Sequence, residues 1–221
     1  MNQHRDLVLM ARAPEPGRTK TRLIPALGAE GAAFLAEAML MDTLALADEE
    51  SDVRLHVAID QSRDAAWFAA ACPEAHLFEQ RGDTFGQRLA NAMCDVSDGH
   101  NHVVALGTDC PHMPTDVLTE AWNCLANSTT DVVLGPASDG GYYLIGWSTP
   151  HPEIVEPVEM STPRVLADTI ELAQRDHLAL HLLTSQFDID QIDDVHRLLD
   201  MLANADASAP FTRAALERIV P

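Results

Sequence analysis

Four basic side chains lie within one short segment, residues 11–23, which reads ARAPEPGRTKTRL. The four are Arg12, Arg18, Lys20 and Arg22. The only acid in the segment is Glu15, whereas the whole chain carries a formal net charge of −20 and has no other lysine. Arginine binds phosphate oxygens through a planar fork, and lysine offers a mobile point charge. The segment is therefore suited to a chain of phosphates; the alternative is a solvated loop whose cations pair with neighbouring acids.

The segment does not have the spacing of a common phosphate-binding loop. It lacks G-x-x-x-x-G-K-[ST], and no G-x-G-x-x-G follows the first expected strand, which disfavours a P-loop and a Rossmann dinucleotide site. Pro14 and Pro16 stiffen the backbone, and Gly17 permits a turn.

Acidic residues follow two other expected strands. Thr108 and Asp109 lie in GTDCP, directly after an apolar strand, and Asp188 and Asp190 lie in FDID near the end of the chain. Two residues apart in extended chain, Asp188 and Asp190 point the same way. Such carboxylates can hold Mg²⁺ that bridges phosphate oxygens. Helix capping is the alternative for Asp109 and for Asp190.

The segment SDGGYY, residues 138–143, is a third polar cluster. Gly140 and Gly141 behind Asp139 indicate a turn or a close approach of backbone to a ligand. Tyr142 and Tyr143 point to opposite faces, so one is expected in the core and the other beside a pocket. A simple hairpin turn is the alternative.

Short apolar runs alternate with helical patterns along the chain, which predicts one α/β domain over residues 1–221 with a mainly parallel sheet covered by helices. Strands are expected at 7–11, 53–60, 76–80, 102–107, 131–137, 141–147 and 178–183. Helices are expected at 28–50, 63–72, 83–96, 114–126, 161–176 and 190–203. Since ligands bind at the carboxyl ends of parallel strands, the basic loop and the acids should meet at one edge.

Composition excludes several classes of protein. The net charge of −20 argues against binding to nucleic acid or to an anionic membrane. The four cysteines have no C-x-x-C spacing, so a zinc site or redox pair is not expected. We found no apolar run near the length of a membrane span and no signal peptide, which predicts a cytoplasmic protein.

Five segments in order resemble one bacterial family. ARAPEPGRTKTRLIPALG, LGTDCPHMP, LGPASDGGYYLIG, MSTPRVLADT and FDIDQIDDV are similar to the radical-SAM/selenodomain-associated transferase 1 family, which is largely uncharacterised. That family is placed in the nucleotide-diphospho-sugar transferase superfamily. The resemblance implies the GT-A fold, a single three-layer α/β/α domain with a mainly parallel mixed sheet. KTRL, residues 20–23, also resembles 2-phospho-L-lactate guanylyltransferase and, more loosely, the molybdenum-cofactor guanylyltransferases.

The resemblance also implies roles for the residues above. The basic loop, with Pro16 and Gly17, would bind nucleotide phosphates; Asp109 would bind metal, completed by Asp188 or Asp190. Asp139, Gly140 and Gly141 would form a wall against the second substrate. Two departures are Met160, where the family often has Trp, and DQIDD at 190–194 in place of acid-Thr-Pro-Glu-Asp.

These observations favour a transferase that depends on Mg²⁺ or Mn²⁺. In the leading version, an acceptor phosphate attacks the α-phosphate of an NTP and pyrophosphate leaves, with Lys20 and Arg22 stabilising phosphate charge. A GT-A glycosyltransferase that uses an NDP-sugar is the alternative, with Asp139 orienting or deprotonating an acceptor hydroxyl. A non-catalytic nucleotide-binding protein is the third option. The expected partners are a nucleotide and a small-molecule acceptor. The oligomeric state stays open, with a homodimer as one option.

Overall fold

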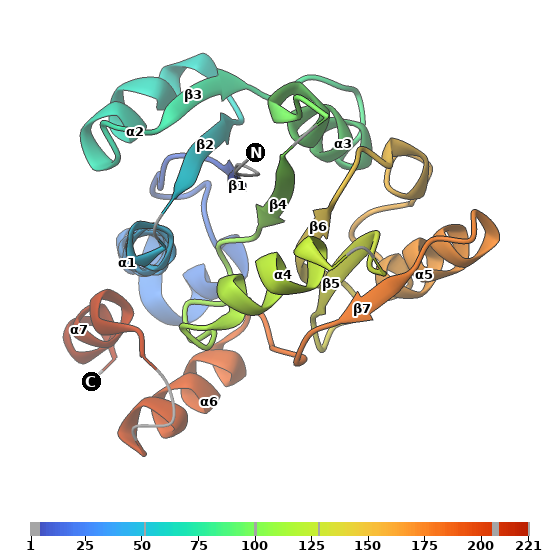
Figure 1. Cartoon of the computed structure of the whole chain (residues 1–221). Coiled ribbons are helices and arrows are strands. Elements are labelled where there is room, and N and C mark those ends of the chain that lie inside the picture. Colours follow the sequence, from blue (N-terminus) through green and yellow to red (C-terminus); the bar gives the residue numbers. More distant parts are fainter. Residues whose placement is uncertain (1–4, 51, 100, 128, 205–207, 221) are drawn as a thin grey trace.

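A seven-stranded sheet forms the centre of the computed structural model, which describes residues 5–50, 52–99, 101–127, 129–204 and 208–220 (Figure 1). The strand order is β3-β2-β1-β4-β6-β5-β7. The strands are β1 (Arg5–Ala11), β2 (Val53–Ile59), β3 (His76–Glu79), β4 (His102–Leu106), β5 (Val132–Pro136), β6 (Tyr142–Trp147) and β7 (Leu180–Leu182).

One strand runs against the other six. β6 is antiparallel to both β4 and β5, whereas the pairs β1–β2, β1–β4, β2–β3 and β5–β7 are parallel. β5 and β6 are joined by the short turn 137–141, which is compatible only with antiparallel neighbours. The predicted mainly parallel mixed sheet is confirmed, and the carboxyl ends of β1, β4, β5 and β7 lie at one edge.

Helices cover both faces of the sheet and make three layers. On one face lie α1 (Ile24–Glu49), α2 (Ala65–Ala71) and α4 (Val117–Ala126), and Figure 1 shows α4 crossing in front of the strands. On the other lie α3 (Phe85–Val96) and α5 (Val165–Arg175). Alternate residues of β1 face the apolar cores on opposite sides of the sheet. Leu7 and Leu9 pack towards α1, and Val8 packs towards α3. Short 3₁₀ turns are η1 (Thr21–Leu23), η2 (Ser62–Asp64) and η3 (Pro152–Ile154).

A third apolar cluster joins α1 to α6 (Ile192–Ala203) and α7 (Pro210–Ile219). Asp42 of α1 is buried, and its two carboxylate oxygens accept hydrogen bonds from the backbone N–H groups of Phe211 and Thr212, at 3.0 and 2.8 Å. The carboxylate therefore satisfies donors that the first turn of α7 leaves unpaired. We did not predict α7 from the sequence, although Pro210 at its first position is a typical start signal.

The other expected elements are confirmed, with ends displaced by a few residues. The predicted start of the long helix at residue 28 coincides with a kink, because Gly28 has φ 72° and ψ 168° inside α1. The expectation of one domain over residues 1–221 reaches beyond the described residues at both ends and stays a prediction.

The segment Thr21–Glu49 is long and apolar enough to cross a membrane, judged by length and composition alone. The sequence prediction that no apolar segment approaches the length of a membrane span was therefore wrong for this segment. Core helices pass the same test, and α1 packs against the sheet on one side and against α6 and α7 on another.

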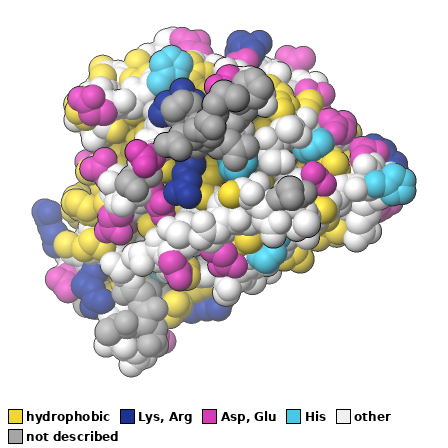
Figure 2. Space-filling view, viewed as in Figure 1, with side chains coloured by type: hydrophobic (Ala, Val, Ile, Leu, Met, Phe, Trp, Pro, Cys, Tyr) yellow, Lys and Arg dark blue, Asp and Glu magenta, His cyan; other side chains and the backbone are white. Residues whose placement is uncertain are grey.

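Figure 2 shows acidic side chains spread over the face seen in Figure 1, as the net charge of −20 suggests.

His112 is a buried histidine just beyond the acidic loop after β4. Its side chain is 3% exposed, neither ring nitrogen has a hydrogen-bond partner among the residues that the structure describes, and its ring lies 4.2 Å from that of Phe187. Burial, together with the positive charge of Arg197, lowers the pKa of His112 from 6.5 to about 4. The folded chain therefore keeps this ring neutral at a pH where the unfolded chain protonates it.

We expect His112 to make the fold sensitive to acid. As the pH falls from 6.5 to 4, the unfolded state gains a proton at this site that the folded state does not, and about 3 kcal/mol of stability is lost. In His112→Leu, urea unfolding should show a smaller loss over the same range. His196→Leu, which removes an exposed histidine of α6, is the control and should behave as wild type. Equal acid sensitivity in wild type and His112→Leu would refute the assignment.

Candidate active site

A cavity of about 790 Å³ opens at the edge of the sheet where β1, β4, β5 and β7 end. Most residues that we predicted for the site line it: Arg12, Arg18, Lys20, Arg22, Thr108, Asp109, Asp139, Tyr142, Asp188 and Asp190. Pro16, Gly17, Gly140 and Gly141 are described by the structure but do not line the cavity. Tyr143, expected on the opposite face from Tyr142, also borders it.

The basic loop is shaped by a turn over residues 15–19. The carbonyl of Glu15 accepts hydrogen bonds from the backbone N–H groups of Arg18 and Thr19, at 3.0 and 3.1 Å. The Thr19 hydroxyl accepts one from the Glu15 N–H, at 3.0 Å. Gly17 has φ +81°, a conformation that costs other residues energy. Gly17 therefore shapes the loop without touching the cavity.

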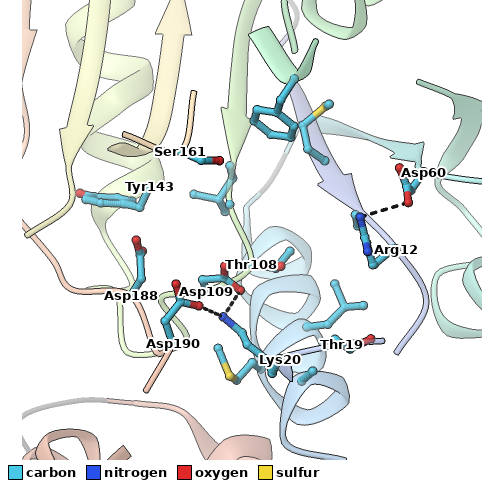
Figure 3. A pocket seen from close by; sticks show the side chains of 18 of the residues that line it. Arg12, Thr19, Lys20, Asp60, Thr108, Asp109, Tyr143, Ser161, Asp188 and Asp190 are labelled. Atoms are coloured by element: carbon cyan, nitrogen blue, oxygen red, sulfur yellow. Dashed lines mark hydrogen bonds and ion pairs between the residues drawn. The ribbon is translucent and has the colours of Figure 1, made fainter. Parts of the chain in front are cut away.

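Lys20 lies at the centre of the site, between two carboxylates (Figure 3). Its Nζ is 2.8 Å from Asp109 Oδ1 and 2.8 Å from Asp190 Oδ1, and its side chain is only 9% exposed. Burial alone would lower the pKa of Lys20, but the charges of Asp109 and Asp190 outweigh it and raise the pKa above 10.5. The ammonium therefore stays charged throughout the physiological range.

The other cations of the loop also pair with acids. Arg12 lies 3.2 Å from Asp60, Arg18 lies 3.3 Å from Glu15, and the exposed Arg22 lies 3.4 Å from Asp190 Oδ2. This pairing is the alternative that the sequence left open for the loop. Exposed ion pairs of this kind contribute little stability, so their arginines remain available to a phosphate.

Asp109 and Asp190 are not helix caps. α4 begins at Val117, and the start of α6 is capped by Asp194, whose carboxylate accepts from the N–H groups of Asp190 and Gln191 at 3.1 and 2.8 Å. The backbone N–H of Ile189 donates to the Asp109 carbonyl at 2.9 Å. That bond holds the two acidic loops side by side, so their carboxylates can act on one cation.

Asp188 belongs to the same cavity but has a different environment. Burial raises the pKa of Asp188 to about 6, although its Oδ1 accepts a hydrogen bond from Cys110 Sγ at 2.9 Å. Asp109 and Asp139 raise this pKa further by repulsion. The Cys110 thiol is buried and its pKa is raised well above 9.0, so it is unsuited to act as a nucleophile.

The acids partly fit a divalent cation. In the described part of the chain, no three His, Cys, Asp or Glu side chains form a group that could hold a metal. Two carboxylates do converge on a single cation, the Lys20 ammonium. Mg²⁺ commonly takes only one or two carboxylates and completes its shell with substrate phosphates and water. Asp109 and Asp190 could therefore supply two carboxylates to an ion whose other ligands are phosphates and water.

Asp139 lies in a hairpin turn, as the simpler sequence interpretation had it. The Gly141 N–H donates to Asp139 Oδ1 at 2.8 Å, and the Ala137 N–H donates to the Gly141 carbonyl at 2.9 Å. The turn still reaches the cavity, because the exposed Asp139 borders it. Gly140 packs under Pro163, in the segment 161–163 that forms the adjoining wall.

Several residues that line the cavity were missed from the sequence. They are Gln80, Phe85 and Arg88, before and at the start of α3, and Ser161 and Thr162. The Arg88 Nε donates to Gln80 Oε1 at 3.2 Å, and the guanidinium lies 5.6 Å from the centre of the Phe85 ring. Among the described residues that line the cavity, Arg88 is the cation with no carboxylate in ion-pair contact. QRGDTFGQR gave no motif, only a helix start.

The fold is that of nucleotide-diphospho-sugar transferases. A crystal structure from Desulfovibrio desulfuricans G20, provisionally assigned to that class, matches with a TM-score of 0.86 and 28% identity, over 98% of this chain and 95% of that chain. CMP:2-keto-3-deoxy-manno-octonic acid synthetase complexed with CTP matches with a TM-score of 0.54 and 11% identity, over 92% and 100%. Rv0371c from Mycobacterium tuberculosis H37Rv, complexed with manganese, matches with a TM-score of 0.56 and 17% identity, over 90% and 99%. The last two show a shared fold alone.

The chain belongs to a family described as an uncharacterized protein conserved in bacteria, DUF2064, whose model matches residues 43–162. That range contains Asp109 and Asp139 but neither the basic loop nor Asp188 and Asp190. No curated protein matches the sequence. The narrower resemblances to the radical-SAM/selenodomain-associated transferases and to 2-phospho-L-lactate guanylyltransferase stay predictions.

We expect Gly140→Ala to destabilise the fold strongly. Gly140 has φ +93°, and an added Cβ would collide with the carbonyl oxygen of Pro163. Gly99 has φ +76° with open space around it, so Gly99→Ala should cost only the conformational penalty, about 1–2 kcal/mol. Gly140→Ala should lose about 1–3 kcal/mol more because the wall must move. Urea unfolding of both variants measures the difference, and equal losses would show that the wall is not packed as described.

Proposed function

We propose that the chain is a metal-dependent nucleotidyltransferase, which transfers a nucleoside monophosphate from an NTP to a phosphorylated small molecule. The observation that carries this proposal is the meeting of the basic loop with Asp109, Asp139, Asp188 and Asp190 in one cavity. In the reaction, an acceptor phosphate oxygen bonds to the α-phosphorus of the NTP. The bond from that phosphorus to the bridging oxygen breaks, and pyrophosphate leaves.

The chain's own residues supply positioning and charge. Lys20, Arg18 and Arg22 would bind the phosphates and offset the negative charge that grows on the departing pyrophosphate. Asp109 and Asp190 would hold Mg²⁺ or Mn²⁺, which would supply positive charge to offset that of the phosphates. A volume of about 790 Å³ is within the range of cavities that enclose such ligands.

The part of the cavity around Arg88 is suited to the acceptor. The Arg88 guanidinium is oriented by Gln80 and lies beside Phe85, and none of the carboxylates in the described part of the chain forms an ion pair with it. An arginine in this condition favours an anionic ligand group, such as a phosphate or a carboxylate. The related structures with CTP and with manganese support the nucleotide and the metal by analogy of fold.

The products of the reaction test the proposal directly. The protein is incubated with each NTP and a panel of sugar phosphates, with Mg²⁺ or with EDTA, and pyrophosphate is measured. We expect metal-dependent release of pyrophosphate with at least one pair. Release of free NDP in a parallel incubation with NDP-sugars would instead favour a glycosyltransferase. The provisional assignment of the D. desulfuricans protein and the exposed Asp139 are compatible with that alternative. Tight nucleotide binding with no turnover would indicate a non-catalytic protein.

Asp109→Asn should abolish metal-dependent turnover and leave the fold intact. Asparagine keeps the size of the side chain but loses the charge that attracts the ion, and Asp109 is 47% exposed, so folding does not depend on its burial. Nucleotide binding without metal should persist or strengthen, because a repelling carboxylate is gone. Asp116→Asn, an exposed acid at the start of α4, is the matched control and should keep activity. Calorimetric titration with and without Mg²⁺ measures nucleotide binding, and pyrophosphate release measures turnover.

Arg88→Gln should raise KM for the acceptor and leave KM for the NTP unchanged. Loss of a charge-assisted hydrogen bond costs about 1.5–3 kcal/mol, which corresponds to a rise of about ten- to a hundred-fold. Arg81→Gln removes an exposed arginine that pairs with Asp95 outside the cavity, and it should change neither KM. A rise in KM for the NTP alone would place the nucleotide, not the acceptor, beside Arg88.

A further inference from the structure

The carboxylates that suit a divalent ion are already neutralised by cations of the protein itself. Asp190 is engaged at both oxygens, with Lys20 Nζ 2.8 Å from Oδ1 and Arg22 3.4 Å from Oδ2. Asp109 Oδ1 shares the same ammonium at 2.8 Å. The two negative charges are thus balanced by two positive ones. A divalent ion that binds without a nucleotide therefore has to displace the Lys20 ammonium from Asp109 and Asp190.

The backbone of Lys20 is strained in a way that serves this contact. Lys20 has φ 47° and ψ 48°, the left-handed region, just before η1. A residue other than glycine is strained in that conformation, and such strain persists where the surrounding structure demands it. Here the strained residue is the one whose side chain is buried between the acids. A compact ammonium, unlike a planar guanidinium, also resembles a metal ion in presenting one point charge to two oxygens.

We propose that Lys20 is a built-in counter-ion that excludes a divalent cation from Asp109 and Asp190 until nucleotide phosphates offer the ammonium another partner. The inference rests on the proposed function, because it concerns the ion site of the same cavity. Phosphate oxygens attract both Lys20 and Arg22, and their departure leaves two carboxylates facing each other with no counter-charge. Metal and nucleotide therefore bind together, each strengthening the other by the same factor.

The test measures binding of Mn²⁺ alone, by electron paramagnetic resonance of the free ion. Lys20→Met keeps the length of the side chain and removes the charge, and it should bind Mn²⁺ at least ten-fold more tightly than wild type. Lys20→Arg keeps the charge and should gain less. Arg12→Met makes the same change in net charge in the same loop, but its partner is Asp60, so it should gain little. The double variant Lys20→Met/Asp190→Asn should lose the gain.

Thermal unfolding gives a second readout that does not require tight binding. In EDTA, Lys20→Met should melt below wild type, because Asp109 and Asp190 repel each other, and Mn²⁺ should raise its Tm more than that of wild type. If Lys20→Met does not fold, Lys20→Gln serves the same purpose. Mn²⁺ affinity and Tm shifts that match wild type in the charge-free variant would overturn the proposal.

The proposal and the function can fail separately. Pyrophosphate release by wild type, with no gain of Mn²⁺ affinity in Lys20→Met, leaves the function standing and removes the counter-ion role. A gain of Mn²⁺ affinity in Lys20→Met, with no turnover of any NTP by wild type, supports the counter-ion role and removes the transferase.

Discussion

One buried ammonium holds together three parts of the chain that are far apart in sequence. Lys20 comes from the loop after β1, Asp109 from the loop after β4, and Asp190 from the segment between β7 and α6. A charge that is only 9% exposed is costly unless it is paired, so these loops cannot separate without leaving it unpaired. Two further contacts join the loops that carry Asp109 and Asp190. The Ile189 N–H donates a hydrogen bond to the Asp109 carbonyl, and Phe187 packs on His112.

The reversal of β6 decides which residues share the cavity with this ion pair. A wholly parallel sheet would need a crossover connection between β5 and β6, whereas the hairpin places Asp139 at the edge where β1 and β4 end. The same turn carries Gly140, over which Pro163 packs, and the neighbouring Ser161 and Thr162 line the same cavity as Arg88. The turn 137–141 and the segment 161–163 thus border the same cavity.

Much of this arrangement follows from local patterns. Apolar periodicity located six helices and seven strands, and the rule that parallel strands end at a common edge brought the basic loop and the acids together. The pairing of Lys20 with Asp190 did not follow, because those residues are 170 positions apart and their contact depends on the left-handed backbone at Lys20. Arg88 was missed because its lack of an ion-pair partner among the described residues depends on which side chains the fold brings next to it. α7 was missed although Pro210 marks its start, and the carboxylate that accepts from its first N–H groups comes from Asp42 of a distant helix.

The two edge strands of the sheet, β3 and β7, affect how copies of the chain could associate. β3 and β7 have only four and three residues, so each outer margin of the sheet offers a short row of unpaired backbone groups. Short margins of this kind give an incoming strand little to pair with and protect a protein against uncontrolled polymerisation through its sheets. Leu182 of β7, at 49% exposure, is an exposed large apolar side chain on such a margin. A stable interface between copies would have to form between the helical layers. There, side chains rather than backbone groups determine which surfaces fit together.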